Sequence, residues 1–88
     1  MDVNLEEADI FDSLASPTRL QILRSLSRQP MNYSDLMKAV GMTRQRAAGR
    51  FAYHLKKLLA ADLVKVNEKS KLYELSRRGK IILQYVDN

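Results

Sequence analysis

Apolar residues recur at helical spacing along most of this 88-residue chain. A first stripe runs from Leu5 to Leu14, with acidic residues on the opposite side of the predicted helix. Ser16 is followed by Pro17, a pairing typical of a helix start, and Pro30 prevents this second helix from continuing. The pattern of the second helix points its arginines outward: Arg19, Arg24 and Arg28.

A short third helix and a long fourth helix are predicted next. Asn32 can cap the third helix, with Asp35 three positions later, and Gly41 supplies a left-handed stop. A helical pattern then continues to about Ala61, and Gly49 lies inside it. Its apolar stripe consists of Ala48, Phe51, Ala52, Leu55, Leu58 and Leu59. A helix, a glycine turn and a longer basic helix follow the order of a helix-turn-helix.

Two strand-like runs, residues 63–66 and 72–75, are joined by a polar segment and predict a β-hairpin. Ser76 then caps a last helix. The sequence therefore predicts a mainly α fold with a small β-hairpin wing, that is, a winged helix-turn-helix. We expect a single domain over residues 1–88 with these parts: terminal helices 1–15 and 76–88, helix-turn-helix 32–61, and wing 63–75.

The charged residues are unevenly distributed along the chain. Residues 1–12 hold five acidic residues and no basic one, whereas residues 13–88 hold all 15 Lys and Arg against five acids, a net charge of +10. Six basic residues and no acidic one lie between Asp35 and Asp62. This distribution favours a polyanionic partner, although small basic domains also occur without one.

The composition excludes several kinds of chemistry. Cysteine is absent and His54 is the single histidine, which excludes disulfides and thiolate zinc sites, and no metal site is expected. No nucleophile–base pair or phosphate-binding loop is visible, so we expect neither an enzyme nor a cofactor. Because no apolar run approaches about 18 residues and no secretory signal is visible, we expect no membrane span and a cytoplasmic location.

The outward side of the long helix carries the candidate contacts to DNA. Opposite its buried stripe the helix presents Arg46, Arg50, Tyr53 and Lys57. Arg44 and Gln45 lie toward its N-terminus, the end that meets base edges in this motif. Such a helix fits the major groove of double-stranded DNA, where arginine can pair with guanine and glutamine with adenine. A solvated basic face is the alternative.

Two further residues of this helix allow more than one interpretation. His54, at the edge of the basic face, is either a phosphate or base contact or a half-buried histidine bonded to the backbone. Tyr53 either contacts a sugar or phosphate or covers the base of the wing. Additional phosphate contacts are expected from the wing tip and the segment after it: Lys69, Lys71 and Arg77, with Arg78 and Lys80 nearby.

Three segments resemble the ArsR-like transcriptional regulators. Residues 14–23 (LASPTRLQIL) resemble the opening signature of that family. Residues 53–58 (YHLKKL), followed by 62–64 (DLV), resemble the end of its recognition helix, and residues 73–80 (YELSRRGK) resemble the junction after its wing. The resemblance covers residues 13–86 and implies DNA binding at a roughly palindromic operator, with repression by obstruction of the promoter.

The sequence departs from the family pattern in two ways. The metal sensors of the family place cysteines at the start of the helix before the turn, where this chain has Asn32 and Ser34, so metal-responsive repression is not expected. From Gly41 to His54 there are about four residues more than is common, about one helical turn. Either the recognition helix is longer or the turn is a longer loop. Archaeal members carry a similar extension, which points to an archaeal source.

The terminal helices carry more apolar surface than a small core needs. In proteins that the chain resembles, these helices form a two-fold dimer, which implies a homodimer interface made of Leu5, Phe11, Leu14, Ile82, Tyr85 and Val86. The alternative is that both helices pack within the chain.

The sequence thus predicts a sequence-specific regulator of transcription that binds double-stranded DNA, a dimeric repressor without metal sensing. The alternatives are a winged-helix protein-interaction module and a sequence-tolerant chromatin- or RNA-binding protein. A protein-binding face would be more apolar than the basic face predicted here. The sequence identifies no effector.

Overall fold

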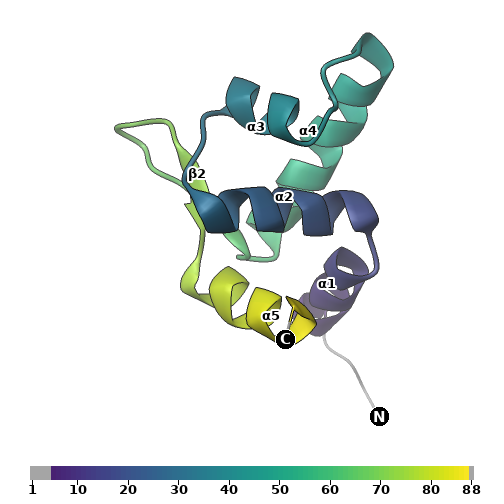
Figure 1. Cartoon of the computed structure of the whole chain (residues 1–88). Coiled ribbons are helices and arrows are strands. Elements are labelled where there is room, and N and C mark those ends of the chain that lie inside the picture. The colour runs from purple at the N-terminus through teal and green to yellow at the C-terminus, as the bar shows by residue number, and fades with distance from the viewer. Residues whose placement is uncertain (1–4, 88) are drawn as a thin grey trace.

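The computed structural model describes residues 5–87 of the chain, with side chains from Ile10 onward. Its elements are α1 Leu5–Leu14, α2 Pro17–Arg28, α3 Tyr33–Ala39, α4 Gln45–Ala60, β1 Val64–Val66, β2 Tyr73–Leu75 and α5 Arg77–Asp87. Helix α2 crosses the middle of the molecule, with α3 and the start of α4 on one side of it and α1 and α5 on the other (Figure 1). The predicted mainly α fold with a hairpin wing is confirmed.

The predicted helix ends are also confirmed. The Oγ of Ser16 accepts a hydrogen bond from the backbone N–H of Arg19 at 3.2 Å, and the Oδ1 of Asn32 accepts one from Asp35 at 2.7 Å. Gly41 has a φ of +70°, the left-handed conformation that ends a helix and favours glycine. These local bonds place α2, α3 and the turn before α4.

The core lies between α2, α4, α5 and the hairpin. It consists of Ile22, Leu23, Leu26, Leu36, Phe51, Leu55, Leu58, Ala61, Leu63, Val64, Leu75 and Leu83. Of the predicted α4 stripe, Phe51, Leu55 and Leu58 are therefore confirmed as buried. Ala52 was predicted to be buried and is exposed, because it lies beyond the edge of the face that packs on α2. Helix α5 contributes Leu83 to this core, whereas Ile82 only packs against its margin.

The hairpin is paired on both sides at its base. Strands β1 and β2 are antiparallel, with Val66 opposite Tyr73. On the other edge of β2, Met31 forms an isolated bridge to Tyr73, with N···O distances of 3.0 and 2.7 Å. At the tip, the Oδ1 of Asn67 accepts hydrogen bonds from the backbone N–H groups of Lys69 and Ser70, at 2.9 and 3.0 Å. The wing is thus joined to the segment before α3 and has an ordered tip.

The start of α5 is fixed to the turn between α4 and β1. The Oγ of Ser76 accepts a hydrogen bond from the Gly79 N–H at 2.9 Å and donates one to the Asp62 carbonyl oxygen at 2.6 Å. The backbone N–H of Ser76 bonds the carbonyl of Leu63 at 3.1 Å. Gly79 is buried, and a Cβ on it would collide with the same Leu63 carbonyl oxygen. Glycine therefore permits this close approach of α5 to the turn.

No helix within residues 5–87 is both long enough and apolar enough to cross a lipid bilayer.

Candidate nucleic-acid interface

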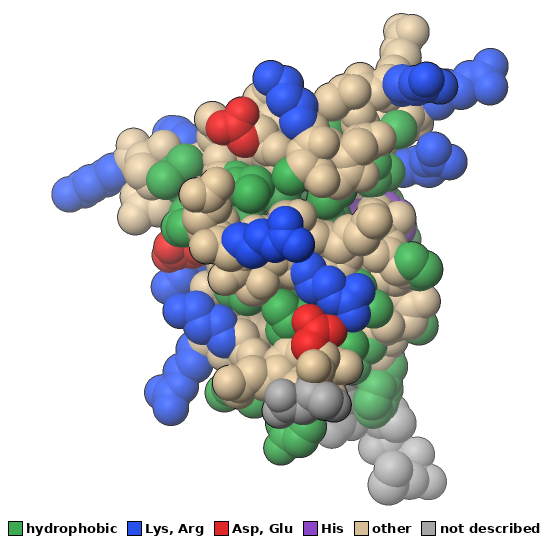
Figure 2. All heavy atoms as spheres, in the orientation of Figure 1, with side chains coloured by type: hydrophobic (Ala, Val, Ile, Leu, Met, Phe, Trp, Pro, Cys, Tyr) green, Lys and Arg blue, Asp and Glu red, His purple; other side chains and the backbone are tan. Residues whose placement is uncertain are grey.

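Helix α4 presents a continuous basic face to solvent. The predicted stripe is exposed at each position: Arg46, Arg50, Tyr53 and Lys57. Arg44 and Gln45, at the start of the helix, are exposed as well. No acidic residue occurs between Asp35 and Asp62, so no carboxylate of the helix neutralises this face. Basic side chains gather around the projecting end of α4 in Figure 2.

The beginning of α4 shows where the additional helical turn lies. The helix begins at Gln45, four positions after Gly41, and continues through Gly49, so the extra residues lengthen the helix. Arg44 precedes it in an extended conformation without a side-chain cap, and the first turn contains no acidic residue. Neither a side-chain cap nor an acidic residue therefore offsets the positive end of the helix dipole at the start of α4, a geometry that suits anions.

The wing adds basic residues, of which two lie at its tip. Lys69 and Lys71 are exposed, and Lys71 adopts a φ of 61°, so it occupies a left-handed turn position. Lys65, on β1, pairs with Glu74 across the hairpin at 3.5 Å. Arg77 is exposed but borders a shallow groove near α1, so it lies away from the tip. The structure thus groups the two tip lysines and separates Arg77 from them.

His54 is bonded to a buried arginine. Its Nδ1 accepts a hydrogen bond from the Nε of Arg19 at 3.0 Å, and the Arg19 guanidinium lies over the Tyr53 ring, 5.7 Å from the ring centroid. Burial, followed by the positive charges of Arg19 and Arg50, holds the pKa of His54 below its ordinary value. His54 is half-buried as one interpretation predicted, but the partner of its Nδ1 is a side chain and not the backbone.

The prediction that Arg19 points outward was wrong. Only 8% of this residue is exposed. Helical spacing assigns charged residues to the outside, but here an acceptor on His54 and the face of Tyr53 receive the guanidinium. The signal in the sequence would have been an arginine in the second helix together with a Tyr-His pair in the fourth. His54 of that pair lies 35 positions after Arg19.

The terminal helices expose three large apolar side chains: Phe11 (60%), Ile81 (45%) and Tyr85 (81%). The other residues predicted for an interface differ in burial. Leu14, Ile82 and Val86 are half-buried, and the side chain of Leu5 lies outside the part that the structure describes. Ile81, which was not predicted for this interface, is part of the exposed apolar surface. An apolar surface on two neighbouring terminal elements is typical of an association site.

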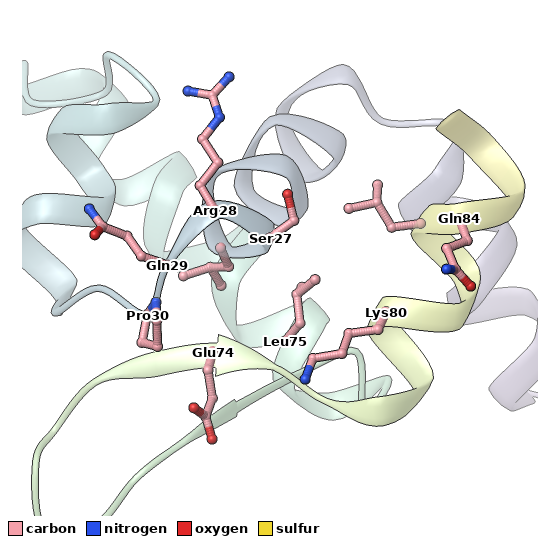
Figure 3. A pocket seen from close by; sticks show the side chains of 10 residues that line it. Ser27, Arg28, Gln29, Pro30, Glu74, Leu75, Lys80 and Gln84 are labelled. Atoms are coloured by element: carbon pink, nitrogen blue, oxygen red, sulfur yellow. The ribbon is translucent and has the colours of Figure 1, made fainter. Parts of the chain in front are cut away.

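A cavity of about 450 Å³ lies between the end of α2, strand β2 and α5 (Figure 3). Its floor is apolar, formed by Leu26, Leu75 and Leu83. Arg28 borders it but extends away from it in Figure 3. The hydroxyl of Ser27 donates to the carbonyl oxygen of Arg24 at 2.6 Å, so it is not bonded to a side-chain base. The sequence did not predict this cavity, which is separate from the basic face of α4.

Among the side chains that the structure describes, no three or more His, Asp or Glu gather where they could hold a metal ion.

Solved structures share this arrangement of elements. NolR from Sinorhizobium fredii matches with a TM-score of 0.74 and 26% identity, over 99% of this chain and 93% of that one. HlyU from Vibrio cholerae matches with a TM-score of 0.74 and 20% identity, over 92% and 87% of the two chains. Mb0332 from Mycobacterium bovis, described as a homodimeric winged helix-turn-helix DNA-binding domain and a possible ArsR-family transcriptional regulator, matches with a TM-score of 0.72 and 22% identity, over 93% and 78%. The chain has the winged helix-turn-helix fold of the ArsR-like regulators.

Residues 7–86 match the model of the family described as Domain of unknown function (DUF7347). The chain belongs to this family. A comparison with curated proteins gave no match.

Proposed function

We propose that this protein is a sequence-specific regulator of transcription that binds double-stranded DNA as a homodimer and represses without sensing a metal. The observation that carries this proposal is the exposed basic face of α4, which has no acidic residue within it. The winged helix-turn-helix fold supports it, since this fold presents one helix to the major groove.

The spacing of the basic residues suits a helix in the major groove. Arg46 and Arg50 lie one turn apart, about 6 Å along the axis, which is close to the rise of two base pairs. Arg50 is placed to meet a base edge, for which guanine is the best match to a guanidinium. Lys69 and Lys71, at the wing tip, are suited to phosphates, which position a protein without reading sequence.

The exposed apolar residues of the terminal helices support a homodimer. Phe11, Ile81 and Tyr85 are exposed on α1 and α5, the helices that lie on the side of α2 away from the projecting end of α4 (Figure 1). A two-fold axis through such a patch would present two copies of α4 to the half-sites of a palindromic operator. The neighbour Mb0332 is described as homodimeric. Repression would then follow from occupation of the promoter.

DNA recognition is tested by titrating fluorescent duplexes with three variants. Arg50→Ala should weaken binding to the DNA that flanks the protein's own gene by about 1–3 kcal/mol, and binding to random DNA by less. Lys71→Gly, which suits the left-handed backbone at that position, should weaken both duplexes alike and reduce the log–log salt slope by about 0.9. Arg24→Ala is the matched control, because Arg24 is exposed and pairs with Asp87 at 2.8 Å.

Equal weakening of both duplexes by Arg50→Ala would make Arg50 a phosphate contact and contradict the proposed orientation of α4. Tighter binding to structured RNA than to either duplex would contradict the choice of DNA.

The dimer is tested by sedimentation at micromolar concentration, which should give twice the chain mass of 10.1 kDa. Tyr85→Asp should halve that mass while circular dichroism keeps its helical signal. A wild-type monomer with full helicity would contradict the homodimer.

A further inference from the structure

Arg19 is a buried cation without a carboxylate partner in the described part of the chain. Within residues 10–87 the ion pairs are Arg24–Asp87 and Lys65–Glu74, and neither includes Arg19. Its partners are the Nδ1 of His54 and the face of Tyr53, both on α4. A buried charge that lacks a counter-ion is unfavourable, so such a group is normally paired or binds an anion.

Part of the Arg19 guanidinium remains available to a ligand. Every fully buried side-chain nitrogen and oxygen atom among the described residues has a hydrogen-bond partner. The side-chain hydrogen bond of Arg19 is made by Nε, and the Nη atoms make none within the described residues. The Nη atoms are therefore not fully buried, although only 8% of the whole residue is exposed.

The bond from Arg19 also determines which His54 nitrogen carries the proton. A guanidinium can only donate, so the Nδ1 of His54 accepts and is unprotonated. Neutral His54 must then carry its proton on Nε2, which becomes a hydrogen-bond donor. Burial, followed by the positive charges of Arg19 from α2 and Arg50 from α4, lowers the pKa of His54 and so favours the neutral ring. Lys57 lies near as well, with its Nζ 5.6 Å from the centroid of the Tyr53 ring.

We propose that Arg19 and His54 form a phosphate-binding site at the edge of α4, in which Arg19 fixes His54 as an Nε2–H donor and adds its own Nη groups. This inference rests on the proposed DNA-binding function. The ligand is a backbone phosphate of the duplex, because a guanidinium and a neutral N–H donor both match its oxygens. Arg19 has two roles here, since it positions His54 and contributes charge.

The state of His54 can be measured before any DNA is added. Long-range ¹H–¹⁵N spectra of the wild-type protein at pH 7.5 (roughly one unit above the ordinary histidine pKa) should show an unprotonated Nδ1 and a protonated Nε2. Addition of a random-sequence duplex should shift the Nε2–H resonance. A protonated Nδ1, or an Nε2–H resonance that does not move when the duplex binds, would overturn the proposal.

Binding titrations with variants separate the two roles. Arg19→Met should weaken operator and random duplexes alike, by roughly tenfold, and lower the salt slope by about 0.9. His54→Leu should weaken both by about fivefold and leave the slope unchanged, because a neutral donor releases no counter-ion. Arg19→Lys keeps the positive charge and should therefore return the salt slope to the wild-type value. Arg24→Met is the control: it makes the same change in the same helix, at an exposed arginine, and should leave the slope unchanged.

The outcomes distinguish this inference from the proposed function. If the wild-type protein binds duplex DNA and both Arg19→Met and His54→Leu bind as tightly, the phosphate site is wrong and the DNA-binding function stands. If His54→Leu weakens the operator alone, His54 is a base contact and the phosphate assignment is wrong. If the wild-type protein binds no duplex, the phosphate site and the proposed DNA-binding function are both wrong. Because Arg19 is buried, thermal melting checks that its variants fold, and the spectra of the wild-type protein need no variant.

Discussion

Two helical glycines are expected to respond in opposite directions to the same added methyl group. Gly49 is exposed in the interior of α4, and a Cβ built on it has no atom within 4 Å apart from its chain neighbours and the adjacent backbone of its own helix. Replacement by alanine should therefore raise the free energy of unfolding by about 1 kcal/mol, the difference in helix propensity between the two residues. For a domain of this size, that increase corresponds to a melting temperature higher by roughly 4–8 °C.

Gly79 is buried in the first turn of α5, where a Cβ would collide with the carbonyl oxygen of Leu63. That oxygen cannot withdraw freely, because it also accepts the backbone N–H of Ser76 at 3.1 Å. Gly79→Ala should therefore lower the free energy of unfolding by about 3 kcal/mol, at the upper end of the range for overpacking, despite the gain in helix propensity.

Urea denaturation followed by circular dichroism measures both effects. All proteins should be compared at one concentration, because the proposed dimerisation would make stability depend on concentration. The midpoint should rise for Gly49→Ala and fall for Gly79→Ala, with a similar slope m for both. If Gly79→Ala is as stable as the wild-type protein, α5 does not approach the turn as described. If Gly49→Ala is destabilised, the first half of α4 is not a solvent-exposed helix in solution.

Three other properties can be predicted from the structure. Ser76→Ala removes the cap of α5 and the hydrogen bond to the Asp62 carbonyl oxygen, so the free energy of unfolding measured in urea should be lower by about 1–2 kcal/mol. An unchanged urea midpoint would contradict this role of Ser76. The pKa of His54 is lowered by burial, Arg19 and Arg50, so the unfolded chain takes up a proton at higher pH than the folded one. The free energy of unfolding should therefore fall as pH is lowered from 6.5, the ordinary pKa of histidine, through the lower pKa of the folded state. The His54→Gln variant should show a smaller decrease. A wild-type free energy of unfolding that does not change over this pH range would contradict the lowered pKa. Zinc and cadmium at stoichiometric levels should leave DNA affinity unchanged in anisotropy titrations, and a tenfold change would show a metal site.

Local patterns were sufficient to predict most of the fold. The caps at Ser16 and Asn32 and the left-handed Gly41 involve bonds between residues at most five positions apart, and such bonds follow from residue type and order. The exposed face of α4 follows in the same way from a period of 3.6 residues. The sequence left open whether the extra turn belongs to the helix or the loop, and the structure places it in the helix.

The features that were missed depend on residues far apart in the chain. Met31 pairs with Tyr73, which lies 42 positions later in the chain. Arg19 is buried because its partner lies in another helix, and a polar pattern within α2 carries no information about that partner. Gly79 is required by a carbonyl group of the turn before β1. Contacts of this kind come from the packing of elements, which the order of residues within one element does not specify.

Helix α4 is held to the protein over only part of its length. Its buried residues, Phe51, Leu55 and Leu58, all lie after Arg50, whereas Gln45 to Arg50 contribute none. Local unwinding of the first six residues therefore exposes little apolar surface. The free energy of this local unwinding should for that reason be well below the free energy of global unfolding. Backbone amide protons should consequently exchange faster in the first two turns than in the last two. Within one continuous helix, the portion that carries the exposed Arg46 and Arg50 is thus the portion whose shape is most easily altered.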